Sequence, residues 1–307
     1  MPTVSIIVPA FNAAKTIAET LKSTEAQEFQ DFEVIVVDDG STDATVEVVR
    51  REFSDVRVIE QENAGPAAAR NHGAAEARGE WLAFLDADDT WLPWRLSLQL
   101  EAAKRQPEIG MWCAETIGMS DTVSSTPENS AGTVGLTLRD FAVSNPVSTT
   151  TVLLRRSLFE QENGFDTQFR GPEDYDLWMR TATHTEIGKI QHPVSRYRQE
   201  VGSLSQDVDK FLPEVLRVLT KAYGSGGALE AHGGSYRKAR AYQYFSASWM
   251  AYCANKTAQA RRLLYHSFFI WPFGFGRCNK ERLIRAKLLF RYCRTPSRCP
   301  NEAAPGR

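Results

Sequence analysis

The sequence feature that most constrains the fold is an apolar run that ends in a cluster of carboxylates. Residues 81–85 read Trp-Leu-Ala-Phe-Leu, and Asp86, Asp88 and Asp89 follow within four residues. A run that is continuously apolar, rather than alternating, is typical of a central parallel strand covered on both faces. We therefore predict a buried strand over 80–85 that delivers three acidic side chains to one edge of a sheet.

The three carboxylates indicate a metal site. Acids this close repel one another unless they are solvated, protonated or offset by a cation. Mg²⁺ and Mn²⁺ take oxygen ligands of this kind and complete their shells with water and substrate phosphate. The alternative is a solvated Asp-rich turn in which Asp89 or Thr90 caps a following helix.

The chain before this run predicts three more units of strand and helix. Strands over 3–8, 32–37 and 56–59 precede helices over 13–26, 44–53 and 66–77. Such alternation implies right-handed crossovers, and therefore an α/β fold with a mostly parallel, Rossmann-like sheet flanked by helices. Ligands of these sheets bind at the carboxyl ends of the strands, where Pro9, Asp39 and Asp86 fall.

The pattern is less regular beyond residue 94. We predict a helix over 94–105, strands near 109–116, 147–154 and 185–190, and a helix that opens at Glu173-Asp174-Tyr175-Asp176. Acids in a first turn are favoured by the helix dipole, so a capping role alone explains Glu173 or Asp174. We expect residues 1–210 to form a catalytic domain.

The composition changes after residue 210. Residues 211–307 contain 17 Lys or Arg against 4 Asp or Glu. Apolar residues at helical spacing predict a basic, aromatic-rich helical region over 211–294, and the tail at 295–307 is predicted to be disordered. The aromatic run at 268–276 permits two interpretations, which are packing within this region and peripheral contact with an anionic membrane.

Several classes of protein are not indicated. The five cysteines show no Cys-x-x-Cys pair and are interpreted as reduced thiols. No signal peptide is predicted at the N-terminus, and no apolar run approaches 18 residues. We expect a cytoplasmic protein, or one peripheral on the cytoplasmic membrane face, and no nucleic-acid partner.

Five segments in order resemble motifs of the inverting family 2 glycosyltransferases, which share the GT-A fold. The segments are Val8-Pro9-Ala10-Phe11-Asn12, Val37-Asp38-Asp39-Gly40-Ser41-Thr42-Asp43, Asn63-Ala64-Gly65 with Ala69-Arg70-Asn71, Asp86-Ala87-Asp88-Asp89, and Glu173-Asp174-Tyr175-Asp176-Leu177-Trp178. The resemblance covers about residues 3–200. It implies a GT-A domain with a C-terminal helical extension, and transfer from a nucleotide sugar, most often UDP-linked, to an acceptor hydroxyl.

The resemblance also implies a role for each matching residue on the donor side. Asp88 is expected to hold Mn²⁺ or Mg²⁺, and Asp86 to contact ribose or metal. Asp39 is expected to accept from the imide N–H of the base, and Arg70 to turn toward the nucleotide. The residues expected to wall the base are Pro9, Ala10 and Phe11.

Inversion requires one displacement, and therefore one general base on the acceptor side. Asp174 resembles that base, and Glu173 and Asp176 are the alternatives. Trp178 is interpreted as a core residue. The Gln-x-x-Arg-Trp sequence of processive synthases does not follow, which favours transfer of a single sugar.

The predicted function is metal-dependent, hexosyltransferase-type transfer to a glycan or lipid-linked acceptor, in cell-surface polysaccharide or glycoconjugate synthesis. A nucleotidyltransferase is the second enzyme hypothesis, although no Gly-rich basic phosphate loop follows the first strand. An inactive sugar-nucleotide-binding scaffold is the hypothesis outside enzymes.

Overall fold

The computed structural model describes residues 1–123, 132–198, 207–275, 285 and 287–288. The chain divides into two compact units, one of Met1–Thr137 with Val147–Glu200 and one of Leu138–Pro146 with Val201–Arg307. This division differs from the expected boundary at residue 210, since 138–146 and 201–210 belong to the second unit. The predicted tail at 295–307 lies outside the described residues, as does most of the predicted pattern at 280–294.

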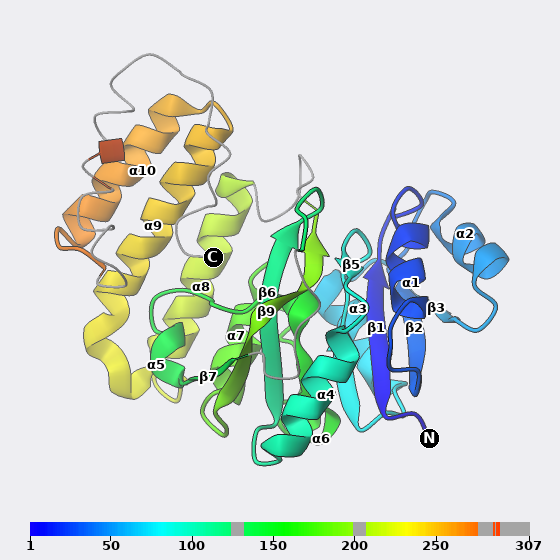
Figure 1. Cartoon of the computed structure of the whole chain (residues 1–307). Coiled ribbons are helices and arrows are strands. Elements are labelled where there is room, and N and C mark those ends of the chain that lie inside the picture. The colour runs from blue at the N-terminus through cyan, green and yellow to red at the C-terminus, as the bar shows by residue number, and fades with distance from the viewer. Residues whose placement is uncertain (124–131, 199–206, 276–284, 286, 289–307) are drawn as a thin grey trace. The chain divides into compact units, whose positions relative to one another are not determined.

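The first unit is built on one large sheet (Figure 1). Its described strands follow the order β3-β2-β1-β4-β8-β6-β9-β5, and β7 pairs with β9. The bounds are β1 Val4–Ala10, β2 Phe32–Asp38, β3 Arg57–Glu60, β4 Trp81–Phe84, β5 Thr90–Trp91, β6 Met111–Gly118, β7 Thr133–Leu136, β8 Leu153–Arg155 and β9 Ile187–Tyr197.

The first four predicted strands are confirmed. β1 lies between β2 and β4 and is parallel to both, and β3 is parallel to β2. The register pairs Ala10 with Asp38, so the polar residues that follow both strands leave the sheet at one edge. The α/β class expected from the sequence is therefore correct.

The second half of the sheet is mixed rather than parallel. β8 is antiparallel to both β4 and β6, and the predicted strand over 147–154 is instead a short 3-10 turn, η1 Thr149–Thr151, followed by β8. The Thr151 hydroxyl donates to the carbonyl of Ser148. Such local side-chain bonds compete with a strand ladder, and this explains the turn.

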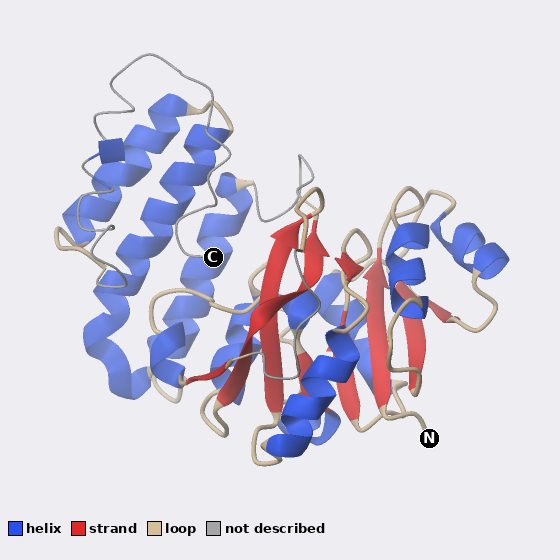
Figure 2. Cartoon of the chain, viewed as in Figure 1, coloured by secondary structure: helices blue, strands red, loops and turns tan. Residues whose placement is uncertain are grey.

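Helices cover both faces of the sheet (Figure 2). On one face, Ile6 and Val8 belong to the same buried cluster as residues of α1 Ile17–Glu25, α2 Thr45–Glu52 and α4 Arg95–Arg105. On the other, α3 Pro66–Ala75 lies so close to β1 that a Cβ on Gly73 would come within 2.6 Å of Ile7 Cγ2. Continuous apolar strands are explained by this double cover.

A chain of aromatic rings completes the α3 face. Phe84 of β4 packs against Phe159 of α6 Arg156–Gln161, with centroids 5.9 Å apart, and against Phe165 at 5.2 Å. Phe165 meets Trp178 of α7 Glu173–Thr181 edge to face at 5.8 Å. Trp178 is fully buried, which confirms that it is a core residue.

The second unit is helical. Its described helices are α5 Leu138–Phe141, α8 Val208–Tyr223, α9 Tyr236–Cys253 and α10 Thr257–Ile270, with the 3-10 segment η3 Glu230–Ser235. Ala239 and Leu264 are fully buried, and the Ser267 hydroxyl donates to the Ala241 carbonyl at 2.7 Å. α9 and α10 therefore pack against each other within the helical region that the sequence predicts.

The aromatic run at the end of α10 and just beyond it faces two environments. Phe275 is buried, and its ring centroid lies 5.1 Å from that of Tyr242 and 5.7 Å from that of Phe245. Phe269 and Phe273 are instead 88% and 65% exposed. Among the described helices, none is both long and apolar enough to cross a membrane.

Candidate active site

Arg70 of α3 joins two of the predicted acidic segments. One Nη donates to Asp86 Oδ1 at 2.7 Å, and the other donates to Glu173 Oε1 at 2.8 Å. Burial by itself lowers the pKa of Arg70, but the carboxylates of Asp86 and Glu173 outweigh it and raise the pKa. Arg70 is therefore a buried, fully charged bridge between the end of β4 and the start of α7.

Local sequence explains why α3 begins where it does. Gly65 has a φ of +90°, which an L side chain would resist, and Pro66 occupies the first turn. The Asp39 carboxylate accepts from the amides of Ala64 and Gly65, both at 2.8 Å, and from Gln61 Nε2 at 2.7 Å. Asp39 thus fixes the loop that leads into α3.

The predicted base, Asp174, lies in the first turn of α7. Its Oδ2 accepts from the Thr149 hydroxyl at 3.0 Å. Burial and the neighbouring Glu173 raise the pKa of Asp174 to about 7, although Arg70 and the bond from Thr149 act to lower it. Asp174 as a residue is only partly buried.

The two alternatives to Asp174 are occupied by cations. Glu173 is 2% exposed and binds Arg70, and its second oxygen accepts from the Gly171 amide at 2.7 Å. Asp176 is equally buried and accepts from Arg180 Nε at 2.9 Å. The capping role considered for Glu173 or Asp174 is wrong, since Pro172 holds the N-cap position with no side-chain cap bond.

The Asp-rich turn after β4 is a compact cluster of like charge. Asp89 is fully buried, and its Oδ1 accepts from the Arg198 amide at 2.9 Å. Burial and the charges of Asp86 and Asp88 raise the pKa of Asp89 to about 8. The capping alternative is wrong for this turn, because Thr90 belongs to β5 and α4 begins at Arg95 with Trp94 as N-cap.

The residues present fit a metal that is shared with a substrate. The described residues contain no group of three or more His, Cys, Asp or Glu arranged to hold an ion, and Asp86 is engaged by Arg70. Mg²⁺ and Mn²⁺ sites that also bind phosphates usually take one or two carboxylates and fill the shell with water and phosphate oxygens. The partly exposed Asp88, in a turn of concentrated negative charge, suits that donor set.

The predicted base-walling residues lie at the end of β1. Pro9 and Ala10 belong to the strand, and the Ala10 carbonyl accepts from the Asp39 amide at 2.8 Å. Phe11 follows them and is 52% exposed. A large, exposed aromatic ring beside the loop after β2 is available to a planar ligand.

A family model described as glycosyl transferase family 2 matches residues 5–161, which is half of the chain. The chain belongs to this family. Membership of this family favours the glycosyltransferase hypothesis over the nucleotidyltransferase one.

Relatives in the family differ in length. An uncharacterized glycosyltransferase of Rickettsia felis is 30% identical over 202 residues, which are 65% of this chain and 33% of that protein. The succinoglycan biosynthesis protein ExoO of Rhizobium meliloti is 37% identical over 62% of this chain and 61% of its own. The glucosyltransferase WfgD of Escherichia coli, described as UDP-Glc:alpha-D-GlcNAc-diphosphoundecaprenol beta-1,3-glucosyltransferase, is 32% identical over 70% of this chain and 85% of its own.

Solved structures of similar fold contain nucleotide sugars. TarS of S. aureus in complex with UDP-GlcNAc is 22% identical, with a TM-score of 0.62 over 88% of this chain and 81% of that one. The mannosyltransferase PcManGT of Pyrobaculum calidifontis, with GDP-Man and Mn²⁺, is 21% identical, with a TM-score of 0.59 over 96% and 81%. At these identities the likeness establishes the GT-A fold of this glycosyltransferase.

Sequence reasoning missed two residues of the glycosyltransferase site. Thr149 contacts Asp174, and the run of three threonines at 149–151 was the available signal. Arg198 donates through Nε to the Asp88 carbonyl at 2.9 Å and pins the Asp-rich turn. No local sequence pattern indicates this contact, because Arg198 and Asp88 lie 110 positions apart.

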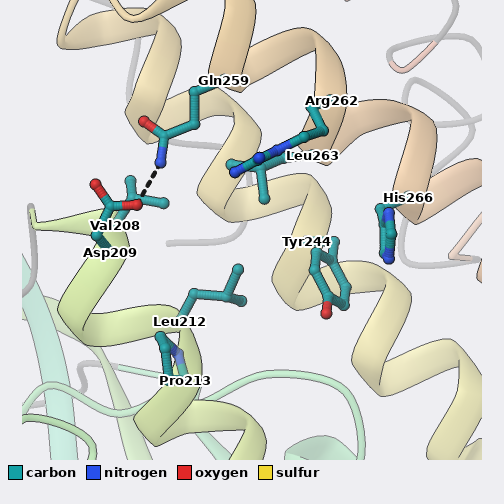
Figure 3. A pocket seen from close by; sticks show the side chains of 9 residues that line it. All are labelled: Val208, Asp209, Leu212, Pro213, Tyr244, Gln259, Arg262, Leu263 and His266. Carbon is teal, nitrogen blue, oxygen red and sulfur yellow. Dashed lines mark hydrogen bonds between the residues drawn. The ribbon is translucent and has the colours of Figure 1, made fainter.

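The helical unit contains an open cavity of about 340 Å³ (Figure 3). One wall is apolar, Arg262 and His266 of α10 lie along another, and Gln259 donates to Asp209 at 2.6 Å at one end. None of the predicted residues lines this cavity, whose side chains are Val208, Asp209, Leu212, Pro213, Tyr244, Gln259, Arg262, Leu263 and His266.

Proposed function

We propose that this glycosyltransferase transfers one sugar, with inversion, from a nucleotide sugar to a hydroxyl of a glycan or lipid-linked acceptor, in cell-surface polysaccharide or glycoconjugate synthesis. The observation that carries the proposal is the position of Asp174 in the first turn of α7, where its Oδ2 accepts from the Thr149 hydroxyl at 3.0 Å, while the neighbouring Glu173 and Asp176 bind arginines. A base near neutrality is what one displacement by a hydroxyl needs.

Asp174 is the proposed general base. Its carboxylate, with a pKa of about 7, accepts the acceptor's proton as the hydroxyl oxygen attacks the anomeric carbon and the bond to the diphosphate breaks. Thr149 fixes the direction of Oδ2. A pKa near the working pH balances the fraction of base that is ionised against its strength.

The donor is proposed to lie along the carboxyl ends of β1, β2 and β4. Pro9, Ala10 and Phe11 line the base, and Asp39, whose carboxylate has four acceptor positions, keeps capacity for a base N–H beyond its loop bonds. Bound Mn²⁺ or Mg²⁺ supplies Lewis-acid stabilisation of the leaving diphosphate. Asp88 holds the ion in this proposal, and Asp86 orients the ribose or shares the ion.

A UDP-linked donor and a lipid-linked acceptor are supported by similarity. WfgD is described with a UDP-glucose donor and a diphosphoundecaprenol-linked acceptor, TarS binds UDP-GlcNAc, and PcManGT binds GDP-Man with Mn²⁺. We therefore rank UDP sugars first and Mn²⁺ ahead of Mg²⁺.

Release of nucleoside diphosphate from UDP-glucose, UDP-GlcNAc and GDP-mannose, with Mn²⁺, Mg²⁺ or chelator, tests the proposal. We expect that at least one donor is turned over, and that this turnover requires metal. Asp174→Asn should keep the donor-induced rise in melting temperature and lose about 10²–10⁴ in rate, the usual range for a general base. No turnover of any donor, or full activity of Asp174→Asn, would overturn the proposal.

The helical unit is proposed to bring the enzyme to an anionic membrane surface on the cytoplasmic side. Tyr265, Phe269 and Phe273 are exposed at intervals of four residues, and Arg261 and Arg262 are exposed one turn earlier. Aromatic rings beside arginines suit the interface of anionic lipids. A lipid-linked acceptor would be found at the same surface.

A further inference from the structure

Arg70 binds Asp86 and Glu173, which come from two separate acidic segments, through one guanidinium group. Asp86, on the loop after β4, belongs to the proposed donor side, and Glu173, beside the proposed base, belongs to the acceptor side. Both accept from the same guanidinium, at 2.7 and 2.8 Å. The Arg70 and Glu173 side chains are 8% and 3% exposed, whereas Asp86 is 33% exposed, so the bridge is buried at one end and open at the other.

A buried bridge of this kind is not explained by stability alone. Removing two charged groups, Arg70 and Glu173, from water costs several kcal/mol for each ion, and a well-packed apolar cluster of similar volume is often as stable. The rigid, planar fork of arginine can meet two carboxylates at once with fixed geometry, which the point charge of lysine cannot reproduce. The neighbouring Phe165 ring, 5.5 Å from the guanidinium carbon, further limits its movement.

We propose that Arg70 is a positioning residue that ties the Asp86 carboxylate to the turn of Glu173 and Asp174, so that the donor-side acid and the base keep one mutual geometry. The inference rests on the proposed function and refines the expectation that Arg70 turns toward the nucleotide. Arg70 acts through its two carboxylate partners, and the direct contacts with substrate are assigned to Asp86 and to Asp174.

The bridge also sets the charge that Asp174 experiences. Two charged groups act on its carboxyl, Glu173 beside it on α7 and Arg70 from α3, and the Thr149 hydroxyl and the Tyr175 amide donate hydrogen bonds to it. Glu173 raises the pKa of Asp174, and Arg70 lowers it. Removing only Arg70 should raise that pKa, removing only Glu173 should lower it, and removing both should return it toward the wild-type value.

The test is a double-mutant cycle with Arg70→Gln, Glu173→Gln and the combined variant, read from UDP release with UDP-glucose between pH 5 and 9. The rising limb of the rate should move to higher pH in Arg70→Gln, to lower pH in Glu173→Gln, and back toward wild type in the combination. At a pH below the limb, each unit of upward movement costs about tenfold in rate. Arg57→Gln, which removes an arginine bound to Glu76 away from the site, should leave the limb in place.

Two further measurements separate this inference from other failures. Arg70→Lys keeps the positive charge and provides a second variant if Arg70→Gln does not fold. Its rate should be lower at every pH, and the rising limb should stay at the same pH. Carboxyl ¹³C NMR titration of Asp174, assigned by its absence in Asp174→Asn, reads the same shifts without donor. Titration midpoints that move in the stated order support the coupling. They do so even if the wild type turns over no nucleotide sugar, because the absence of turnover rejects only the proposed function. Midpoints that coincide in all variants overturn the inference.

Discussion

At the scale of single residues, Asp88 is proposed to hold metal without stabilising the fold. It is partly exposed, and its charge raises the pKa of the buried Asp89 next to it. Asp88→Ala should therefore lose metal-dependent turnover by at least about 10²-fold, while its melting temperature in chelator stays equal to or above that of wild type. UDP release against Mn²⁺ concentration measures the turnover and a thermal melt in chelator measures the stability, with the exposed Asp55→Ala as control. Near-wild-type activity would leave the Asp-rich turn with a structural role.

Asp174 should make stability depend on pH. Its pKa is raised from an ordinary value of 3.8 to about 7 in the folded protein, so the folded state binds more protons than the unfolded state between these values. The contribution of Asp174 to the free energy of unfolding is therefore fully present below about pH 4, and it is lost as the pH rises to about 7. Asp174→Asn does not titrate, so it should melt above wild type at pH 8, by about 2–4 °C for each kcal/mol gained.

The comparison is made by differential scanning calorimetry at pH 4, 6 and 8. The difference between the two melting temperatures should grow with pH and level off above about 7. Thr220→Val, in the helical unit, serves as the control. A difference that is constant over this range would show that Asp174 titrates in the folded protein much as it does in the unfolded chain.

At the scale of elements, side chains of β5 and α4 hold the backbone of η1 in place through hydrogen bonds. Trp91 Nε1 donates to the carbonyl of Thr150 at 3.0 Å, Gln99 Nε2 to Thr151 at 2.8 Å and Arg95 Nη2 to Val152 at 2.9 Å. Arg95 also stacks on Trp91, with its guanidinium carbon 3.4 Å from the ring centroid. These three bonds fix the backbone that presents Thr149 to Asp174.

Trp91→Phe should remove the hydrogen bond that Trp91 donates to η1, while an aromatic ring stays buried at this position. The loss of one buried hydrogen bond and some volume is expected to cost about 1–3 kcal/mol, and the displaced Thr149 to lower turnover roughly tenfold. Trp94→Phe is a matched control, because its indole also donates to a backbone carbonyl, that of Pro193, at 3.0 Å. Equal effects of the two variants on turnover would show that the hydrogen bonds to η1 have no specific role in the site.

The same elements explain which parts of the site were predictable from the sequence. β1, β2 and β4 were predictable because apolar runs that end in Pro9, Asp39 or Asp86 carry their own stop signals. The turn at η1 was not, since its three threonines have high strand propensity and the turn depends on bonds from residues 52 to 59 positions away. The pairing of Arg70 with Glu173 spans 103 positions, and no local pattern specifies it.

At the scale of the whole molecule, charge and exposed aromatics are distributed unevenly. Residues 211–307 carry the 17 basic against 4 acidic residues, whereas residues 1–210 contain 19 basic against 34 acidic ones. Within the described part of the helical unit, Phe269 and Phe273 expose most of their surface. Each Lys or Arg close to an anionic surface contributes roughly 1 kcal/mol, so a few basic residues suffice for reversible binding.

Co-sedimentation of the full chain with vesicles tests the proposed membrane contact. Vesicles containing phosphatidylglycerol should retain the protein at low salt and release most of it at 0.5 M salt, where charges are strongly screened, and phosphatidylcholine vesicles should retain little. Phe269→Ser combined with Phe273→Ser should lower retention several-fold, because the rings lose their apolar contribution at the interface. Val134→Ser, which alters an exposed apolar residue of the sheet unit, should bind as wild type does. If wild type and the double variant remain equally in the supernatant with anionic vesicles at low salt, peripheral binding is rejected and the aromatic run serves packing alone.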